Sequence, residues 1–124
     1  MKRRFTTIGA LLLLFLVTSC ASAPDQGVHM SHKGDVDAGV YTKGADTFGP
    51  GDVPTVVVTG CGERNVTIEL IDAASGTIVQ TRRDYVPRNW TRWWFFPGLP
   101  PGSYQVVLRI AGTVSGSASF TVTE

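Results

Sequence analysis

The sequence predicts a small all-β domain made of two packed sheets, and three observations support this prediction. From residue 52 onward, β-branched and aromatic residues gather in short runs in which apolar and polar residues alternate. Gly, Pro, Asn and Asp separate these runs at regular intervals. Nothing in this region has the apolar period of an amphipathic helix. Short alternating strands divided by turn residues are typical of an antiparallel sandwich.

The first three predicted strands span residues 54–59, 65–71 and 77–85. The first is a β-branched run that ends at the Gly-Cys-Gly sequence around Cys61. The second alternates between apolar and polar residues, which places its apolar side chains on one face. The third begins after an Asp-Ala-Ala-Ser-Gly turn and ends before Pro87.

The last three predicted strands span residues 91–96, 104–110 and 117–123. The first of them is dense in aromatic residues. The second alternates cleanly and places a tyrosine, a valine, a leucine and an isoleucine on one face. The third directs an alanine, a phenylalanine and a valine inward. The folded domain is therefore predicted to span residues 52–124.

The segment Leu-Pro-Pro-Gly-Ser-Tyr at residues 99–104 resembles the L-x-P-G-x-Y segment of fibronectin type III and related immunoglobulin-like domains. The resemblance implies a tyrosine corner, in which Tyr104 buries its ring while its hydroxyl bonds to backbone a few residues upstream. Similar turns occur in transthyretin-like and carboxypeptidase-regulatory-type domains. The early-strand tryptophan of the fibronectin family and the inter-sheet cysteine pair of antibody domains are both missing. The predicted fold class is an immunoglobulin-like or fibronectin type III-like two-sheet sandwich.

The start of the chain is typical of an export signal. Basic residues at 2–4 precede an apolar run at 8–17 and two small residues. The Val-Thr-Ser-Cys sequence that ends at Cys20 then resembles the lipobox of bacterial lipoproteins. This resemblance implies that residues 1–19 are a cleaved signal peptide and that the Cys20 thiol carries diacylglycerol.

Two alternatives exist for this segment, an uncleaved transmembrane helix and a cleaved signal without lipid. Spanning a bilayer takes about 20 apolar residues, and the apolar run here is shorter. The lipobox resemblance favours lipidation, which implies a bacterial cell envelope location and contact with membrane lipid through Cys20. Ala21 occupies the position where lipoproteins retained at the inner membrane typically carry Asp. It therefore favours the outer membrane if the source has two membranes.

Residues 20–51 are predicted to be a lipidated, flexible tether. They contain few large apolar residues and no sustained apolar period, so they bury too little surface to offset the entropy of ordering. A flexible chain of this length has an end-to-end distance of about 30 Å. Within the tether, His29 and His32 together with Asp35 and Asp37 form a group of metal-binding residue types. In a tether these side chains are expected to be solvated, so neither a metal nor another cofactor is predicted.

Charge and residue types exclude several functions. Without the three basic signal residues, eight of the eleven Lys and Arg residues remain against ten Asp and Glu. Such a chain has no basic stripe to neutralise phosphates, so nucleic-acid binding is not predicted. Residues 52–124 contain no histidine, which removes the general base of a Ser-His-Asp arrangement. The protein is therefore predicted not to be an enzyme.

The second cysteine, Cys61, has no disulfide partner in the chain if Cys20 carries lipid. Between two glycines, it is interpreted as a small residue in a turn. The alternative is a free thiol or an intermolecular disulfide.

The aromatic run that begins at Trp90 is the unusual cluster of the domain. Strand alternation directs Trp94 and Phe96 into the core. Trp93 and Phe95 then lie on the outer face, where together with Trp90 they form a predicted binding surface. Alternatively, long neighbouring side chains cover these rings by stacking.

The candidates for such a cover are Arg82, Arg92 and Arg109. Two functional hypotheses follow from an aromatic surface on a lipid-anchored domain. The first is a non-catalytic binding or structural module that contacts an unidentified envelope protein. The second is a carbohydrate- or peptidoglycan-recognition module in which the predicted binding surface stacks on sugar rings.

Overall fold

A computed structural model describes residues 27–60, 64–86 and 90–124. The predicted signal peptide, Cys20 and Cys61 lie outside the described residues, so the predictions made for them stay predictions. In the part of the chain that is described, no helix is long and apolar enough to cross a membrane.

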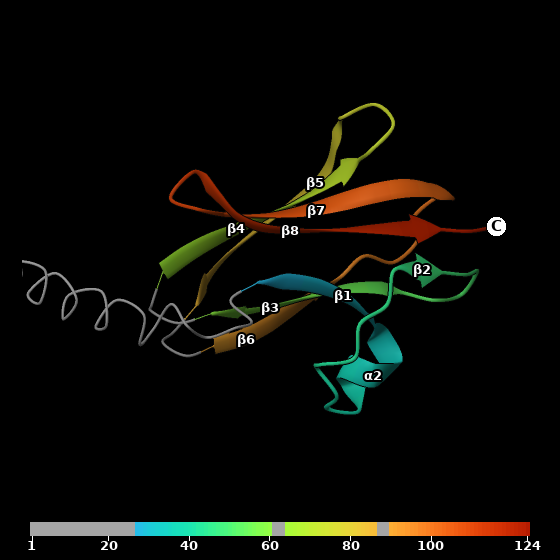
Figure 1. The fold of residues 1–124 in the computed structure, drawn as a ribbon, viewed down its shortest axis with the longest axis horizontal. Helices are drawn as coiled ribbons and strands as arrows, with labels where there is room; N and C mark the ends of the chain where they lie inside the picture. The colour runs from blue at the N-terminus through green and yellow to red at the C-terminus, as the bar shows by residue number, and fades with distance from the viewer. Residues whose placement is uncertain (1–26, 61–63, 87–89) are drawn as a thin grey trace, which may run out of the picture.

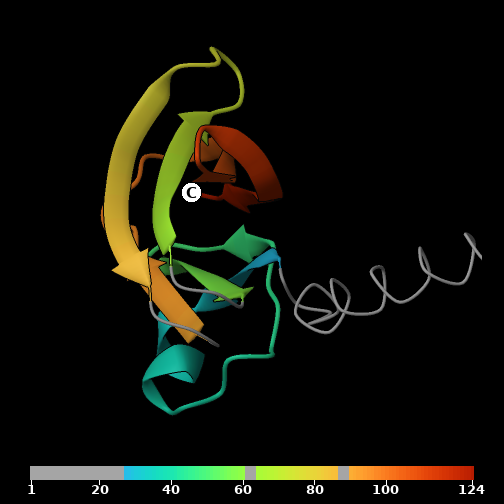
Figure 2. The ribbon, with the colours of Figure 1, turned by 90° about the vertical axis from the view of Figure 1, so that its left-hand side faces the viewer.

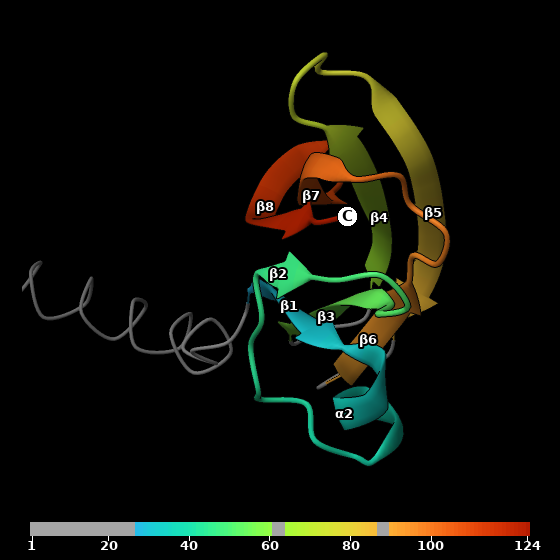
Figure 3. The ribbon, with the colours of Figure 1, turned by 90° about the vertical axis from the view of Figure 1, so that its right-hand side faces the viewer.

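Two β-sheets pack face to face, which confirms the predicted two-sheet sandwich (Figure 1). In chain order, the elements are β1 (Val28–His32), α2 (Lys33–Asp37), β2 (Thr47–Phe48), β3 (Pro54–Gly60), β4 (Arg64–Asp72), β5 (Ile78–Val86), β6 (Trp90–Phe95), β7 (Gly102–Ile110) and β8 (Thr113–Val122). The small sheet has the order β1-β3-β6, and the large sheet has the order β2-β8-β7-β4-β5. Figure 3 shows the two sheets as separate layers.

The six strands that the sequence predicts are present as β3 to β8, with ends shifted by a few residues. In the large sheet, β4 pairs with β5 and β7, and β7 pairs with β8, all antiparallel. In the small sheet, β3 pairs antiparallel with β6. From β3 onward, the chain therefore moves between the sheets after β3, β5 and β6. This is the Greek-key connectivity of an immunoglobulin-like sandwich.

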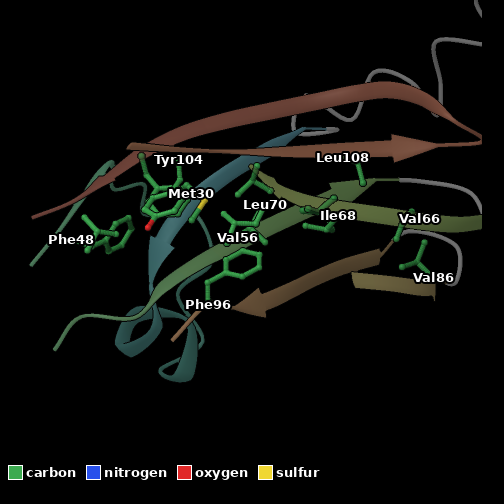
Figure 4. Packing of buried hydrophobic residues seen from close by; sticks show 14 of the residues in the cluster. Met30, Phe48, Val56, Val66, Ile68, Leu70, Val86, Phe96, Tyr104 and Leu108 are labelled. Atoms are coloured by element: carbon green, nitrogen blue, oxygen red, sulfur yellow. The ribbon is translucent and has the colours of Figure 1, made fainter. Parts of the chain in front are cut away.

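The core lies between the facing sides of the two sheets (Figure 4). In β4, the alternate residues Val66, Ile68 and Leu70 are at most 1% exposed, which confirms the predicted alternation. In β7, Val106 and Leu108 lie directly opposite two of them and are also buried. Further members of the core are Met30, Phe48, Val56, Val86, Phe96, Tyr104, Phe120 and Val122.

The tyrosine corner implied by residues 99–104 is present. The Tyr104 hydroxyl donates a hydrogen bond to the Pro100 carbonyl at 2.6 Å, and the residue is 5% exposed. Its ring stacks on Phe120 with the centroids 5.4 Å apart. Burial, and secondarily the negative charge of Asp72, raises the pKa of the Tyr104 hydroxyl. The fold therefore holds the neutral, hydrogen-bonded form.

The predicted tether is wrong from residue 28 onward. β1 pairs with β3 along its whole length, and β2 runs parallel to β8. Met30 is 2% exposed and Phe48 is fully buried, and both belong to the core. Fully burying a phenylalanine stabilises a fold by about 1.5–3 kcal/mol, so this segment gains order from strands that are distant in sequence. The folded domain begins at Val28 and not at residue 52.

Residues 33–46, which we call the strap, form a further layer on the outer side of the small sheet (Figure 3). The strap consists of α2 and the loop that follows it. Val36 of α2 is only 2% exposed. Near the end of the strap, the Ala45 amide donates to the Met30 carbonyl at 2.8 Å. The small sheet is therefore covered on both faces.

The tyrosine corner makes a stability prediction. Tyr104→Phe keeps the ring but leaves the buried Pro100 carbonyl without its donor, so it should lower the free energy of unfolding by roughly 1–3 kcal/mol. Ser103→Ala is the control, because Ser103 is exposed and its loss should change little. Denaturant unfolding measures both variants. Equal, negligible effects would contradict the corner.

The same hydroxyl predicts a loss of stability at alkaline pH. Because folding raises the pKa of Tyr104, the unfolded chain releases this proton at lower pH than the folded chain. The stability that the fold gains from this raised pKa is fully present below the ordinary pKa of 10.0 and is lost as the pH rises above it. Denaturant unfolding below pH 10.0 and above it measures this loss of stability. The loss should be smaller in Tyr104→Phe, which has no hydroxyl to ionise. An identical alkaline loss in both proteins would assign it to another group.

Candidate functional site

The predicted binding surface maps to the outer face of the small sheet. On β6, Trp93 lies opposite Val57 of β3, and Phe95 lies opposite Thr55. Strand alternation gives these side chains a common face, which is the face under the strap. Tyr41 of the strap contacts Trp93. We call Tyr41, Trp93 and Phe95 the aromatic strip.

The strap contacts the strip at two points. The rings of Tyr41 and Trp93 stack with their centroids 4.9 Å apart and their planes 22° apart. The Lys33 ammonium lies 4.9 Å from the centroid of the Phe95 ring, which is a cation–π contact. The same ammonium binds the Asp37 carboxylate at 2.6 Å. Trp93 remains 37% exposed, so the strip presents a partly open indole that is fixed by its neighbours.

The alternation predicted for β6 is confirmed, but one residue was placed on the wrong side. Phe96 is fully buried and Trp94 packs against the core, so both point inward. Trp90 is 5% exposed and also belongs to the core, so its inclusion in the predicted binding surface is wrong. It has the same strand parity as Trp94, which is the physical reason. A Cβ on Gly60 would come within 2.7 Å of its indole.

The arginines expected to cover the aromatic strip make other contacts. Arg82 stacks over the ring of Phe96, 5.5 Å from the centroid. Arg92 and Arg109 form ion pairs with carboxylates at 3.5 and 2.9 Å. The cover comes from the strap, which sequence reasoning missed because it assigned this segment to the tether. The sequence feature that could have indicated this cover was a tyrosine and a lysine within an otherwise small and polar segment.

The two histidines that the sequence analysis named as metal-binding types do not point toward a common site. His29 and His32 are three positions apart on β1, so they lie on opposite faces of the strand. The His29 Nε2 atom lies 2.7 Å from the Tyr41 carbonyl oxygen, and the His32 ring meets Phe48 edge-on. Within residues 27–60, 64–86 and 90–124, no group of three or more His, Cys, Asp or Glu could hold a metal ion.

The cavities of the described surface include a larger and a smaller one. The larger, of about 540 Å³, is lined by loops near Val53, Leu99 and Val122. The Asp52 carboxylate at this cavity already accepts the amide of Gly49 at 2.9 Å. The smaller, of about 350 Å³, lies between β1 and β8. We assign no active site to either cavity.

No protein-family model matches the chain, and no curated protein does either. Among solved structures, the chain is similar to the CARDB domain of a protein from Pyrococcus furiosus, which was crystallised in complex with di-metal ions. The two chains are 14% identical, and the match covers 78% of this chain and 84% of the other, with a TM-score of 0.45.

The contact between strap and strip predicts a change in tryptophan exposure. Tyr41→Ala removes the ring that covers one face of Trp93, so collisional quenching of tryptophan fluorescence by acrylamide should increase. Tyr85→Ala is the matched control, because Tyr85 lies on β5 in the other sheet and is 53% exposed. Unchanged quenching in Tyr41→Ala would contradict the stacked arrangement.

Proposed function

We propose that the protein is a lipid-anchored lipoprotein of the bacterial cell envelope and that its sandwich is a non-catalytic binding or structural module. The observation that carries this proposal is the Val-Thr-Ser-Cys sequence that ends at Cys20 after a basic start and an apolar run. Two or more acyl chains on such a cysteine would hold the protein firmly on a membrane. Ala21 favours the outer membrane in a cell that has two.

The short link between Cys20 and the folded domain supports an anchoring role. Gly27 is the seventh residue after Cys20, and a chain of this length spans at most about 25 Å. Lipid on Cys20 would therefore keep the sandwich near the headgroups, where it could contact the membrane surface or other envelope components.

The contacts of the carboxylates support a non-catalytic role. Those of Glu69 and Asp84 pair with arginines at 2.9 and 3.5 Å. The Asp72 carboxylate accepts the amide of Ala74 at 2.9 Å within the turn between β4 and β5. These interactions stabilise strands and a turn, and they account for these three acidic side chains without a reaction.

A second candidate function is recognition of a carbohydrate, such as the glycan of peptidoglycan. Trp93 favours this function, because its indole is 37% exposed and is held in place by Tyr41. The Lys33 ammonium beside Phe95 adds a hydrogen-bond donor at the edge of the same surface. An exposed aromatic group with a polar rim is typical of a binding site.

The anchor is tested by Cys20→Ser. This variant removes the thiol that would carry lipid, so the protein should move from the membrane fraction to the soluble envelope fraction. Mass spectrometry of the wild-type protein should show the added mass of acyl chains on the peptide that begins at Cys20. A variant that stays entirely with membranes and retains a lipid mass would overturn the lipid-anchor proposal.

Carbohydrate recognition is tested by Trp93→Ala. In a pull-down with purified peptidoglycan, the wild-type protein should bind and the variant should lose most of this binding. Tyr85→Ala again serves as the control, since it removes an exposed aromatic ring from the other sheet. Equal binding by all three proteins, or binding by none of them, would leave the protein-contacting module as the better assignment.

A further inference from the structure

The described chain begins at one end of the sandwich. The Gly27 carbonyl accepts the Thr59 amide at 3.3 Å, close to the end of β3. β4 begins at this same end, because it starts at Arg64 shortly after β3 ends at Gly60, and β5 ends beside it, because Arg64 pairs with Val86. Figure 1 places the C-terminus at the opposite end of the molecule. Any anchor that precedes Gly27 therefore reaches the domain from the end where β4 begins.

Three arginines of the described chain, Arg83, Arg92 and Arg109, lie in the half of the sandwich near Gly27, which we call the arginine end. Arg83 and Arg109 lie on either side of Thr67, near the start of β4. Arg92 lies on β6 beside the end of β3. Figure 2 views the molecule from this side, where β5 ends and β6 begins. The Arg82 guanidinium instead reaches the Phe95 carbonyl at 3.3 Å, opposite Thr55 near the start of β3, so its charge belongs to the other half.

The carboxylates in this half leave it positively charged. Among the described residues, Glu69 and Asp84 lie here, and they pair with Arg109 and Arg92. The side chains of these two arginines still have 38% and 43% of their surface exposed. Arg83 is exposed as well. Among the described side chains, three arginines against two carboxylates leave the arginine end with a small net positive charge.

The opposite half of the domain is acidic. α2 follows the end of β1 in this half, and the turn after β4 and the C-terminus also lie there. Lys33, Lys43 and the Arg82 guanidinium oppose the acidic group. That group consists of Asp35, Asp37, Asp46, Asp52, Asp72 and Glu124. The folded domain thus separates its charges along the strands, although the net charge of the mature chain is small.

We propose that the arginine end docks on an anionic phospholipid surface. The inference rests on the proposed anchor at Cys20, whose link of at most about 25 Å joins this end of the domain to the membrane. Anionic headgroups would raise the partition coefficient roughly fivefold for each arginine near the surface. Guanidinium groups also bind phosphate oxygens in bidentate geometry.

The same surface would repel the acidic half, so docking orients the sandwich. The strands then point away from the bilayer, and the loops at residues 49–54 and 98–101 lie outermost. These loops line the cavity of about 540 Å³, which is therefore presented to partners outside the membrane.

Vesicle co-sedimentation of the unacylated mature chain, residues 20–124 with Cys20→Ser, tests docking separately from the anchor. Vesicles of phosphatidylglycerol mixed with phosphatidylcholine should bind this chain, and vesicles of phosphatidylcholine alone should not. Added salt should weaken the binding because it screens the charges. Arg83→Gln combined with Arg92→Gln should lower the partition coefficient by roughly 25-fold.

The matched control is Lys33→Gln combined with Lys43→Gln, which changes the net charge equally at the opposite end and should bind at least as well as the parent. Equal losses in the two double variants would overturn the proposal, because net charge would then explain binding. Equal binding to both kinds of vesicle, or to neither, would also overturn it. If the arginine variant melts at a lower temperature than the parent, the parent chain alone tests the proposal. It should then bind only the anionic vesicles and lose this binding when salt is added. The acyl mass on Cys20 tests the anchor independently of these outcomes.

Discussion

The strand β3 contains three consecutive valines that must be buried on both faces of one sheet. Val56, Val57 and Val58 are all fully buried. Because neighbouring residues of a strand point to opposite faces, such a run needs cover on each side. Val56 and Val58 belong to the core between the sheets, whereas Val57 lies on the outer face beside Trp93, where α2 of the strap contacts β3. Burying a valine stabilises a fold by about 1.5–3 kcal/mol, so the strap gains its order from the strand beneath it.

This double cover positions the other features of the molecule. On β1, the Ser31 hydroxyl donates to the Lys43 carbonyl at 2.7 Å, which ties the strap to the sheet edge. The strap in turn brings Tyr41 against Trp93, so the partly exposed indole rests on ordered chain. Because β1 belongs to the sheet, the link to Cys20 is short and meets the domain at the arginine end. The proposed recognition surface and the proposed orientation both depend on this arrangement.

Local sequence patterns were sufficient to predict the strands β3 to β8 and the corner at Tyr104, since alternation and turn residues are properties of neighbouring positions. The strap could not be found in this way, because its order depends on strands that are distant in sequence. Its signal lay in β3, where a valine run without alternation indicates burial on both faces. For the candidate site, alternation correctly placed Trp93 on the outer face. The same rule, applied as far back as Trp90, would have placed that residue in the core.

Hydrogen–deuterium exchange of the mature protein tests most directly whether residues 28–48 belong to the folded domain. The Lys33 amide donates to the Val53 carbonyl, and the Ala45 amide donates to the Met30 carbonyl. Both amides should therefore exchange far more slowly than those of an unstructured peptide, alongside the amides of β3. Exchange of these amides at the rate of an unstructured peptide, while β4 and β7 stay protected, would contradict the double cover of the small sheet.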